Sequence, residues 1–138
     1  MVVFDHMECG SMDKIAKEYK DLSYEFIKYS LYIVAKGLRD LHSVNVIHRD
    51  IKAKNILYGL DGSIKITDLG CAVQLNRNQR DRETSGRNIG TLNFWAPEMF
   101  EGKTYSKEID VWAYGCFAYE LATGKQPFED FINDHELK

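Results

Sequence analysis

A short loop between His48 and Asn55 carries an acid, a cation and an amide at close spacing. Asp50 can accept a proton from an attacking hydroxyl group. Lys52, two residues later, can neutralise charge on a phosphoryl group, and Asn55, five residues after the acid, can ligate magnesium. Taken alone, each of these residues is better explained by a solvated turn or a helix cap. Their joint spacing predicts a loop that handles phosphate.

A second carboxylate, Asp68, follows a hairpin that is predicted to begin where this loop ends. Residues 56–58 and 64–66 are short apolar segments, and the Asp-Gly pair between them is a strong turn signal. Asn55 and Asp68 therefore fall at the two ends of the hairpin, where a rigid scaffold can hold two oxygen ligands close to one metal ion. We expect both residues to ligate magnesium.

Two helices are predicted to support these residues. From about Ser23 to His42, apolar residues recur at alternating spacings of four and three, which indicates an amphipathic helix with one face on a core. A second helix is predicted from an N-cap at Ser106 to about Thr123, with Gly124 as its stop. It is apolar nearly all round, which favours a central, buried position. Its apolar residues are Ile109, Val111, Trp112, Ala113, Cys116, Phe117, Ala118 and Leu121.

The remaining segments are shorter or polar. Residues 1–7 are predicted to end a strand, which breaks before a polar helical turn, with a connector near Gly10. Residues 44–47 can form a short strand. Residues 76–88 lack any apolar side chain, which predicts an exposed, mobile loop.

The overall composition is that of one ordinary globular domain. The chain has 138 residues, of which 44% are hydrophobic and 28% charged, and its net charge of -3 gives no electrostatic reason to expect nucleic acid. No segment fits a signal peptide or a membrane span. The cysteines, Cys9, Cys71 and Cys116, show no spacing typical of zinc or of a redox dithiol, which favours the reducing cytoplasm.

Four motifs occur in a fixed order along the chain. They are His48-Arg49-Asp50, Asp68-Leu69-Gly70, Ala96-Pro97-Glu98, and an aspartate and tryptophan at Asp110 and Trp112. In this order the chain resembles the eukaryotic protein kinase family, whose signatures are HRD, DFG, APE and an Asp-Trp pair in a buried helix. The resemblance implies an α+β fold, mostly the helical C-terminal lobe of a kinase with a short β-hairpin after the catalytic loop.

The resemblance also implies the reaction and its cofactors. A kinase transfers the γ-phosphate of ATP to a hydroxyl group of a protein substrate, with Mg²⁺ bound to the phosphates. In that scheme Asp50 is the catalytic base, Lys52 offsets the charge of the phosphoryl group, and Asn55 and Asp68 hold the metal. Leu69 stands where the family has phenylalanine, and we expect it to keep the packing behind Asp68.

Further residues point to the serine/threonine branch of the family. Lys52 after the acid, and Gly90-Thr91 before the APE motif, resemble serine/threonine kinases, in which Thr91 would hydrogen-bond Asp50 and Lys52. The segments HRDIKAKNIL and GTLNFWAPEMF are most similar to kinases of the sterile group. The resemblance places the adenine pocket at Phe4 as gatekeeper, at the backbone of Asp5 and Met7, and at Leu57 beneath the ring.

Regulation by phosphorylation is also implied. Arg49 would pair with a phosphate on the polar loop, and Thr84 and Ser85 are the candidate acceptors for an activating kinase. In the sterile group a phosphorylated threonine sits four residues before the residue that matches Thr91, whereas this chain has Arg87 there.

The match begins at the hinge of a kinase and ends just after its buried central helix, so we expect residues 1–138 to form a partial kinase domain without the N-terminal lobe. The sequence contains no glycine-rich phosphate loop, strand lysine or partner glutamate of that lobe. One alternative is therefore a truncated, catalytically inactive kinase-like binding module. Another is a small-molecule phosphotransferase, which lacks the peptide-positioning segment from Gly90 to Glu98.

Overall fold

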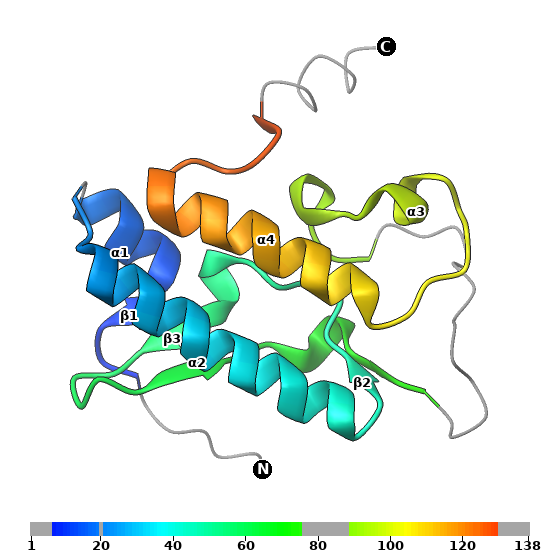
Figure 1. The fold of residues 1–138 in the computed structure, drawn as a ribbon, viewed down its shortest axis with the longest axis horizontal. Helices are drawn as coiled ribbons and strands as arrows, with labels where there is room; N and C mark the ends of the chain where they lie inside the picture. The colour runs from blue at the N-terminus through cyan, green and yellow to red at the C-terminus, as the bar shows by residue number, and fades with distance from the viewer. Residues whose placement is uncertain (1–6, 20, 76–88, 130–138) are drawn as a thin grey trace.

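The structure, a computed structural model, describes residues 7–19, 21–75 and 89–129 (Figure 1). These residues form an α+β fold of helices packed on small antiparallel sheets. The helices are α1 (Met12–Glu18), α2 (Tyr24–Ser43), α3 (Pro97–Phe100) and α4 (Glu108–Thr123). The strands are β1 (Gly10–Ser11), β2 (Val46–Ile47), β3 (Ile56–Tyr58), β4 (Ile64–Ile66) and β5 (Val73–Gln74). Short 3₁₀ turns are η1 (Ala53–Asn55), η2 (Leu69–Cys71) and η3 (Leu92–Phe94).

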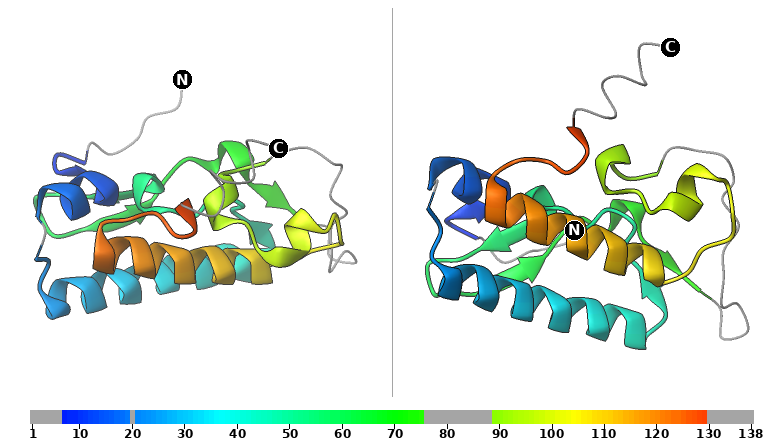
Figure 2. Two further views of the ribbon diagram at one scale, coloured as in Figure 1. Left: turned by 90° about the horizontal axis from the view of Figure 1, so that it is seen from above. Right: turned by 45° about the horizontal axis from the view of Figure 1, so that its top comes forward.

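The predicted amphipathic helix is confirmed as α2. Ser23 caps it, because its hydroxyl oxygen accepts a hydrogen bond from the Phe26 backbone N–H at 3.2 Å. Val34 and Leu38 from the predicted apolar stripe are buried, at 0% and 5% exposure. This face packs on β4, β2 and α4. Figures 1 and 2 show α2 and α4 side by side and antiparallel, forming one layer against the strands.

The predicted hairpin is confirmed as the antiparallel pair β3–β4, with Ile56 opposite Ile66. The connector predicted near Gly10 is a turn at residues 8–9, and Gly10 and Ser11, which were expected to belong to it, form strand β1 on the other edge of β3, opposite Tyr58 and Leu57. Backbone pairing with the hairpin edge explains this short strand. The predicted strand at 44–47 is β2, which pairs with β5 in a second sheet.

The second predicted helix, α4 (Glu108–Thr123), starts one residue later than expected. Lys107 rather than Ser106 precedes its first turn, and no side chain caps it. Its end is as predicted, since Gly124 follows Thr123 with a left-handed φ of 68°. Burial on all sides is wrong. One face carries the buried Ile109, Ala113 and Phe117, whereas Val111 exposes 60% of its surface.

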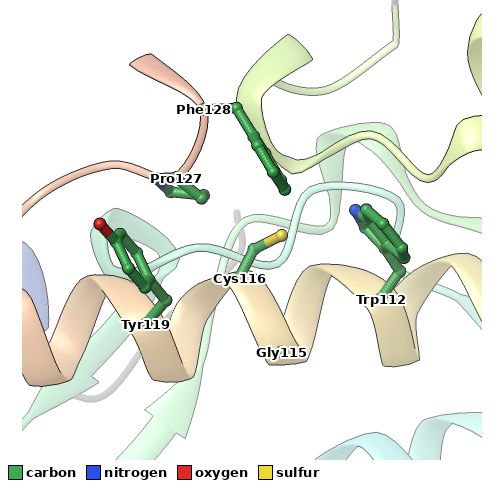
Figure 3. Close-up of a pocket in the computed structure, with 6 residues that line it drawn as sticks. All are labelled: Trp112, Gly115, Cys116, Tyr119, Pro127 and Phe128. Carbon is green, nitrogen blue, oxygen red and sulfur yellow. The ribbon is translucent and has the colours of Figure 1, made fainter. Parts of the chain in front are cut away.

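The exposed face of α4 borders an apolar groove of about 420 Å³ (Figure 3). Phe128 stacks on Trp112 across this groove, with ring centroids 6.3 Å apart and planes 14° apart. Among the described residues, other elements pack against only one side of α4. The opposite side is therefore exposed, although the helix carries apolar residues nearly all round. The lining residues are Trp112, Gly115, Cys116, Tyr119, Pro127 and Phe128.

The core lies between the helical layer and the strands and extends under the loop of residues 48–55. Ile51 and Ala53 of this loop are fully buried in the main cluster, which also contains Phe117 of α4. A second cluster around Ile47 and Ile109 supports the start of the loop. The 48–55 loop is therefore fixed from below by apolar packing. No helix in the described part of the chain is both long and apolar enough to cross a lipid bilayer.

Candidate active site

Asp110 of α4 fixes the start of the 48–55 loop. Its side chain is completely buried. One carboxylate oxygen, Oδ2, accepts the His48 backbone N–H at 2.8 Å and lies 2.8 Å from His42 Nε2, while Oδ1 accepts the Arg49 N–H at 2.8 Å. Arg49 has a left-handed φ of 67°, a strained backbone for an arginine. The buried carboxylate holds this strained turn directly before Asp50.

Asp50 is the centre of a dense hydrogen-bond network. Its carboxylate lies 2.8 Å from Lys52 Nζ and accepts hydrogen bonds from Thr91 Oγ1 at 2.8 Å and Asn55 Nδ2 at 2.9 Å. Lys52 also donates to Thr91 Oγ1 at 2.6 Å. Asn55 donates to the Asp50 backbone carbonyl at 2.8 Å as well. The four residues predicted as catalytic thus lie together in one site.

Burial and hydrogen bonding act in opposite directions on Asp50. Burial disfavours its charged form, but the hydrogen bonds from Lys52, Thr91 and Asn55 and the charge of Lys52 outweigh it. The pKa of Asp50 is therefore held below its ordinary value of 3.8. The site keeps this carboxylate ionised and oriented at neutral pH.

Gly90 allows the Thr91 segment to approach the loop. Its φ of 83° lies in the left-handed region, and a Cβ at this position would overlap the backbone carbonyl oxygen of Arg49. Only glycine combines that backbone angle with that close approach. Because Thr91 is the next residue, the glycine is what brings the threonine hydroxyl onto Asp50.

The two predicted metal ligands are held by neighbouring backbone segments. The Thr67 N–H donates to the Asn55 carbonyl at 2.9 Å, which places Asp68 one residue beyond a direct partner of Asn55. Asp68 is exposed, has a left-handed φ of 62°, and accepts the Gly70 N–H on Oδ1 at 3.1 Å. No three His, Cys, Asp or Glu side chains among the described residues gather as a metal site. One carboxylate and one amide are a donor set of hard oxygens that fits Mg²⁺ together with nucleotide phosphates.

The packing expected of Leu69 is wrong. Its side chain exposes 56% of its surface. It borders a second groove of about 450 Å³ formed by α2 and β4. The η2 turn directs this side chain outward, so the apolar character of Leu69 is kept without burial.

The predicted adenine-contacting residues are described only in part. Phe4 and Asp5 lie outside the described residues. Met7 lies beside the hairpin, where its Sδ is 4.0 Å from Ser63 Oγ and its carbonyl accepts the Gly10 N–H at 3.1 Å. Leu57 lies on β3 opposite Ser11. The structure therefore places Met7 and Leu57 on adjacent segments, and their contact with a nucleotide stays a prediction.

Arg49 is engaged within the described residues. Its Nε donates to the Cys71 carbonyl at 2.6 Å, and an NH group donates to the Tyr105 hydroxyl at 3.3 Å. The side chain therefore ties the 48–55 loop to the end of η2. Thr84 and Ser85 lie outside the described residues, so the predicted pairing of Arg49 with a phosphate stays a prediction.

Sequence reasoning missed Glu120. This residue of α4 exposes only 5% of its surface, and its Oε2 accepts the Ala53 backbone N–H at 2.9 Å. A glutamate in the middle of an apolar helix was the available signal, because such a charge is rarely buried without a partner. His42, which faces Asp110, was missed in the same way.

Comparison with known families agrees with this geometry. A family model described as "Protein kinase domain" matches residues 1–138. The chain belongs to the protein kinase family. It is 39% identical over 92% of its length to "Serine/threonine-protein kinase ste20" of Emericella nidulans, and 38% identical over 99% to "Serine/threonine-protein kinase pak-1" of Caenorhabditis elegans. The "Aurora kinase" of Schizosaccharomyces pombe is 39% identical over 88% of the chain.

These relatives confirm the predicted serine/threonine type, and the chain is a protein serine/threonine kinase by family. The ste20 and pak-1 kinases and the Aurora kinase match this chain at nearly the same identity, so the comparisons support the family rather than one subgroup of it. The kinase chain spans 14%, 33% and 23% of the ste20, Aurora and pak-1 relatives, respectively.

Proposed function

We propose that the chain contributes the catalytic loop and the acceptor-facing segment of a serine/threonine protein kinase that transfers the γ-phosphate of ATP to protein hydroxyl groups. The observation that supports this most strongly is the Asp50 network. A carboxylate 7% exposed is contacted by a lysine, a threonine and an asparagine, all within 2.9 Å. Phosphoryl transfer requires such positioned charges more than covalent participation by the protein.

Each residue of the network has a distinct proposed role. Asp50 orients the acceptor hydroxyl and takes its proton as the new phosphoester bond forms. Lys52 offsets negative charge on the transferred phosphoryl group. Thr91 holds Asp50 and Lys52 in register and forms the wall against which the acceptor serine or threonine would lie. Asn55 restrains Asp50 through its amide N–H groups.

Asn55 and Asp68 would hold Mg²⁺ against the nucleotide phosphates. The Nδ2 atom of Asn55 faces Asp50, so its Oδ1 is directed away from that carboxylate. Asp68 follows Thr67, whose N–H donates to the Asn55 carbonyl, and it carries an exposed carboxylate. When bound, the metal neutralises phosphate charge. We propose that Leu57, Met7, Phe4 and Asp5 receive the adenine of ATP.

The proposed partners follow from this reaction. The substrate is a protein serine or threonine in the cytoplasm. An activating kinase is proposed to act on Thr84 or Ser85, with Arg49 as the residue that receives the phosphate. A phosphate there would add charge that an arginine can pair with, which would order the segment before Gly90.

A non-catalytic binding module is the second candidate. The exposed Asp68 and Leu69 and the open groove along α4 favour it, because they leave apolar and acidic surface uncovered in the described part of the chain. In that case the 138-residue chain would retain the Asp50 network but would not turn over ATP. The two candidates therefore differ in a single measurable activity.

The test is transfer of radiolabelled phosphate from Mg·ATP to casein. Under the kinase proposal, Asp50→Asn lowers transfer by about 10² to 10⁴-fold, which is the typical contribution of a general base. Asp61→Asn, at the exposed hairpin turn, is the matched control and should leave transfer unchanged. Transfer that survives Asp50→Asn would contradict the role of the acid. The absence of any transfer by the wild-type chain would favour the binding module.

A further inference from the structure

Helix α4 carries a second buried carboxylate that reaches the 48–55 loop. Asp110 binds the loop just before Asp50, and Glu120, ten residues later on the same buried face, binds it just after Lys52. At 1.5 Å per residue the two carboxylates are about 15 Å apart along the helix axis. The loop is therefore attached to one rigid element on both sides of the catalytic acid.

We propose that Glu120 is a positioning residue for phosphoryl transfer, which fixes the half of the loop that carries Lys52 and Asn55 through its hydrogen bond with the Ala53 N–H. The contribution of Glu120 to phosphoryl transfer rests on the proposed kinase function. The hydrogen bond between Glu120 and the Ala53 N–H does not depend on that function.

The environment of Ala53 shows why this acceptor matters. Ala53 is completely buried, so its N–H has no access to water and would be unsatisfied without Glu120. Glu120 Oε2 accepts this bond at 2.9 Å. An apolar side chain at position 120 would leave the Ala53 N–H without this acceptor.

The titratable groups around Glu120 come from three elements. Asp13 and Lys17 of α1, Lys52 of the loop, and Cys116 on the preceding turn of α4 all interact with it electrostatically. Burial raises the pKa of Glu120 above its ordinary value of 4.5, and the hydrogen bond from Ala53 opposes that rise. The Ala53 N–H is thus the backbone group that favours the charged form of Glu120.

The hydrogen bond between Ala53 and Glu120 restrains Lys52 and Asn55 through a short stretch of backbone. Ala53 begins η1, and within this turn the Asn55 N–H donates to the Lys52 carbonyl at 2.9 Å. Lys52 has an extended backbone, with φ −163° and ψ 163°. Its side chain returns from there to Asp50 and Thr91. A shift of Ala53 would therefore move both Lys52 and Asn55 relative to Asp50.

Amide hydrogen exchange in the 138-residue chain tests the contact without any catalytic assay. In Glu120→Ala, exchange at Ala53 should accelerate about tenfold or more, while the His48 and Arg49 amides, which bind Asp110, stay within about twofold. Glu120→Gln retains a carbonyl acceptor and should preserve slow exchange at Ala53. Glu108→Ala, at an exposed glutamate of α4, is the matched control. An equal acceleration at all these amides would show only general destabilisation and would overturn the proposal.

A pH titration provides a second readout, with Glu120→Gln as the test variant and Glu108→Ala as the control. The Ala53 amide proton shift in the wild type should follow the titration of Glu120, with a midpoint above pH 4.5. This inflection should disappear in Glu120→Gln and persist in Glu108→Ala. A wild-type Ala53 signal without the inflection, or an inflection that survives Glu120→Gln, would overturn the contact.

Steady-state kinetics then separate an effect of Glu120 on the position of the catalytic groups from an effect on the stability of the fold alone. Glu120→Ala should lower kcat about tenfold while the KM for ATP stays within about twofold, and Glu120→Gln should restore most of kcat. An unchanged kcat in Glu120→Ala would overturn the positioning role. A wild-type chain that transfers no phosphate would count against the proposed function, whereas the exchange and titration results would still decide whether Glu120 holds the loop.

Discussion

The 48–55 loop and the Asp68–Cys71 turn are neighbouring parts of one candidate site, but they are held in different ways. Asp50 is 7% exposed and is contacted by Lys52, Thr91 and Asn55. Asp68 is exposed, and the hydrogen bond that holds its side chain comes from Gly70 of its own turn. The side chain of Asp50 is held by its own loop and also by Thr91, 41 residues away in sequence, whereas that of Asp68 is held by its own turn.

This difference indicates which part of the site is positioned by the tertiary fold. The acid is positioned by α4 and by the Gly90-Thr91 segment, so its geometry is a consequence of the tertiary fold. The side proposed to hold the metal rests on a short exposed turn, whose stability depends on few buried contacts. Substitutions on the loop side should therefore have large effects on stability, and those on the turn side small ones.

The largest effect is expected at Asp110. Asp110→Ala removes the acceptor of the buried His48 and Arg49 N–H groups and the partner of His42. Since each unsatisfied buried group costs about 1–3 kcal/mol, we expect the free energy of unfolding to fall by about 3 kcal/mol or more. Urea denaturation followed by circular dichroism measures it. Asp61→Ala at the exposed hairpin turn serves as the control, and equal losses in the two variants would contradict the account.

A smaller effect is expected at Gly90, with Gly62 as a matched control. The two glycines have nearly equal φ values, 83° and 81°, but an added Cβ meets the Arg49 carbonyl at Gly90 and nothing within 4 Å at Gly62. Gly62→Ala should cost about 1–2 kcal/mol for the left-handed backbone alone. Gly90→Ala should cost this and about 1–3 kcal/mol more for the steric overlap. Similar denaturation midpoints for the two variants would rule out the close approach that we assign to Gly90.

The smallest effect is expected on the turn side, at Leu69. Because its side chain is 56% exposed, Leu69→Ala should change the free energy of unfolding by less than about 0.5 kcal/mol. Leu38→Ala, at a leucine 5% exposed on α2, should cost about 2–5 kcal/mol in the same experiment. A loss of several kcal/mol at Leu69 would show that the turn is packed after all and would remove the contrast between the two regions.

The parts of the fold that the sequence predicts are those that local patterns determine. The stripe of α2 and the Asp-Gly turn of the β3–β4 hairpin are periodic or turn signals, and both are confirmed. The one-sided burial of α4 could not be predicted, because it depends on how many layers pack around the helix. Strand β1 could not be predicted either, since only its pairing with β3 makes Gly10 and Ser11 part of a sheet.

The candidate site divides in the same way. Asp50, Lys52 and Asn55 could be recognised together because they lie within six consecutive residues. Thr91 is 41 residues from Asp50, and only the family resemblance predicted their contact. The role of Glu120 was not predictable, because its partner is a backbone N–H that carries no signal in the side-chain pattern.

The central claim is that the fold holds Asp50 ionised through Thr91 and Lys52, and this claim has a defined dependence on pH. The folded pKa of Asp50 lies below its ordinary value of 3.8. The ionised carboxylate therefore contributes stability above pH 3.8, and this contribution is lost as the pH falls through the lower folded pKa. Thr91→Val and Lys52→Met should both reduce it, whereas Thr91→Ser, which keeps the hydroxyl, should not.

The most direct measurement is a titration of the Asp50 carboxyl carbon by ¹³C NMR in the wild-type chain and in these three variants. The account predicts a wild-type pKa below 3.8 that rises in Thr91→Val and in Lys52→Met and stays low in Thr91→Ser. A wild-type pKa at or above 3.8, or a value that none of the substitutions changes, would contradict the claim that this network holds Asp50 ionised.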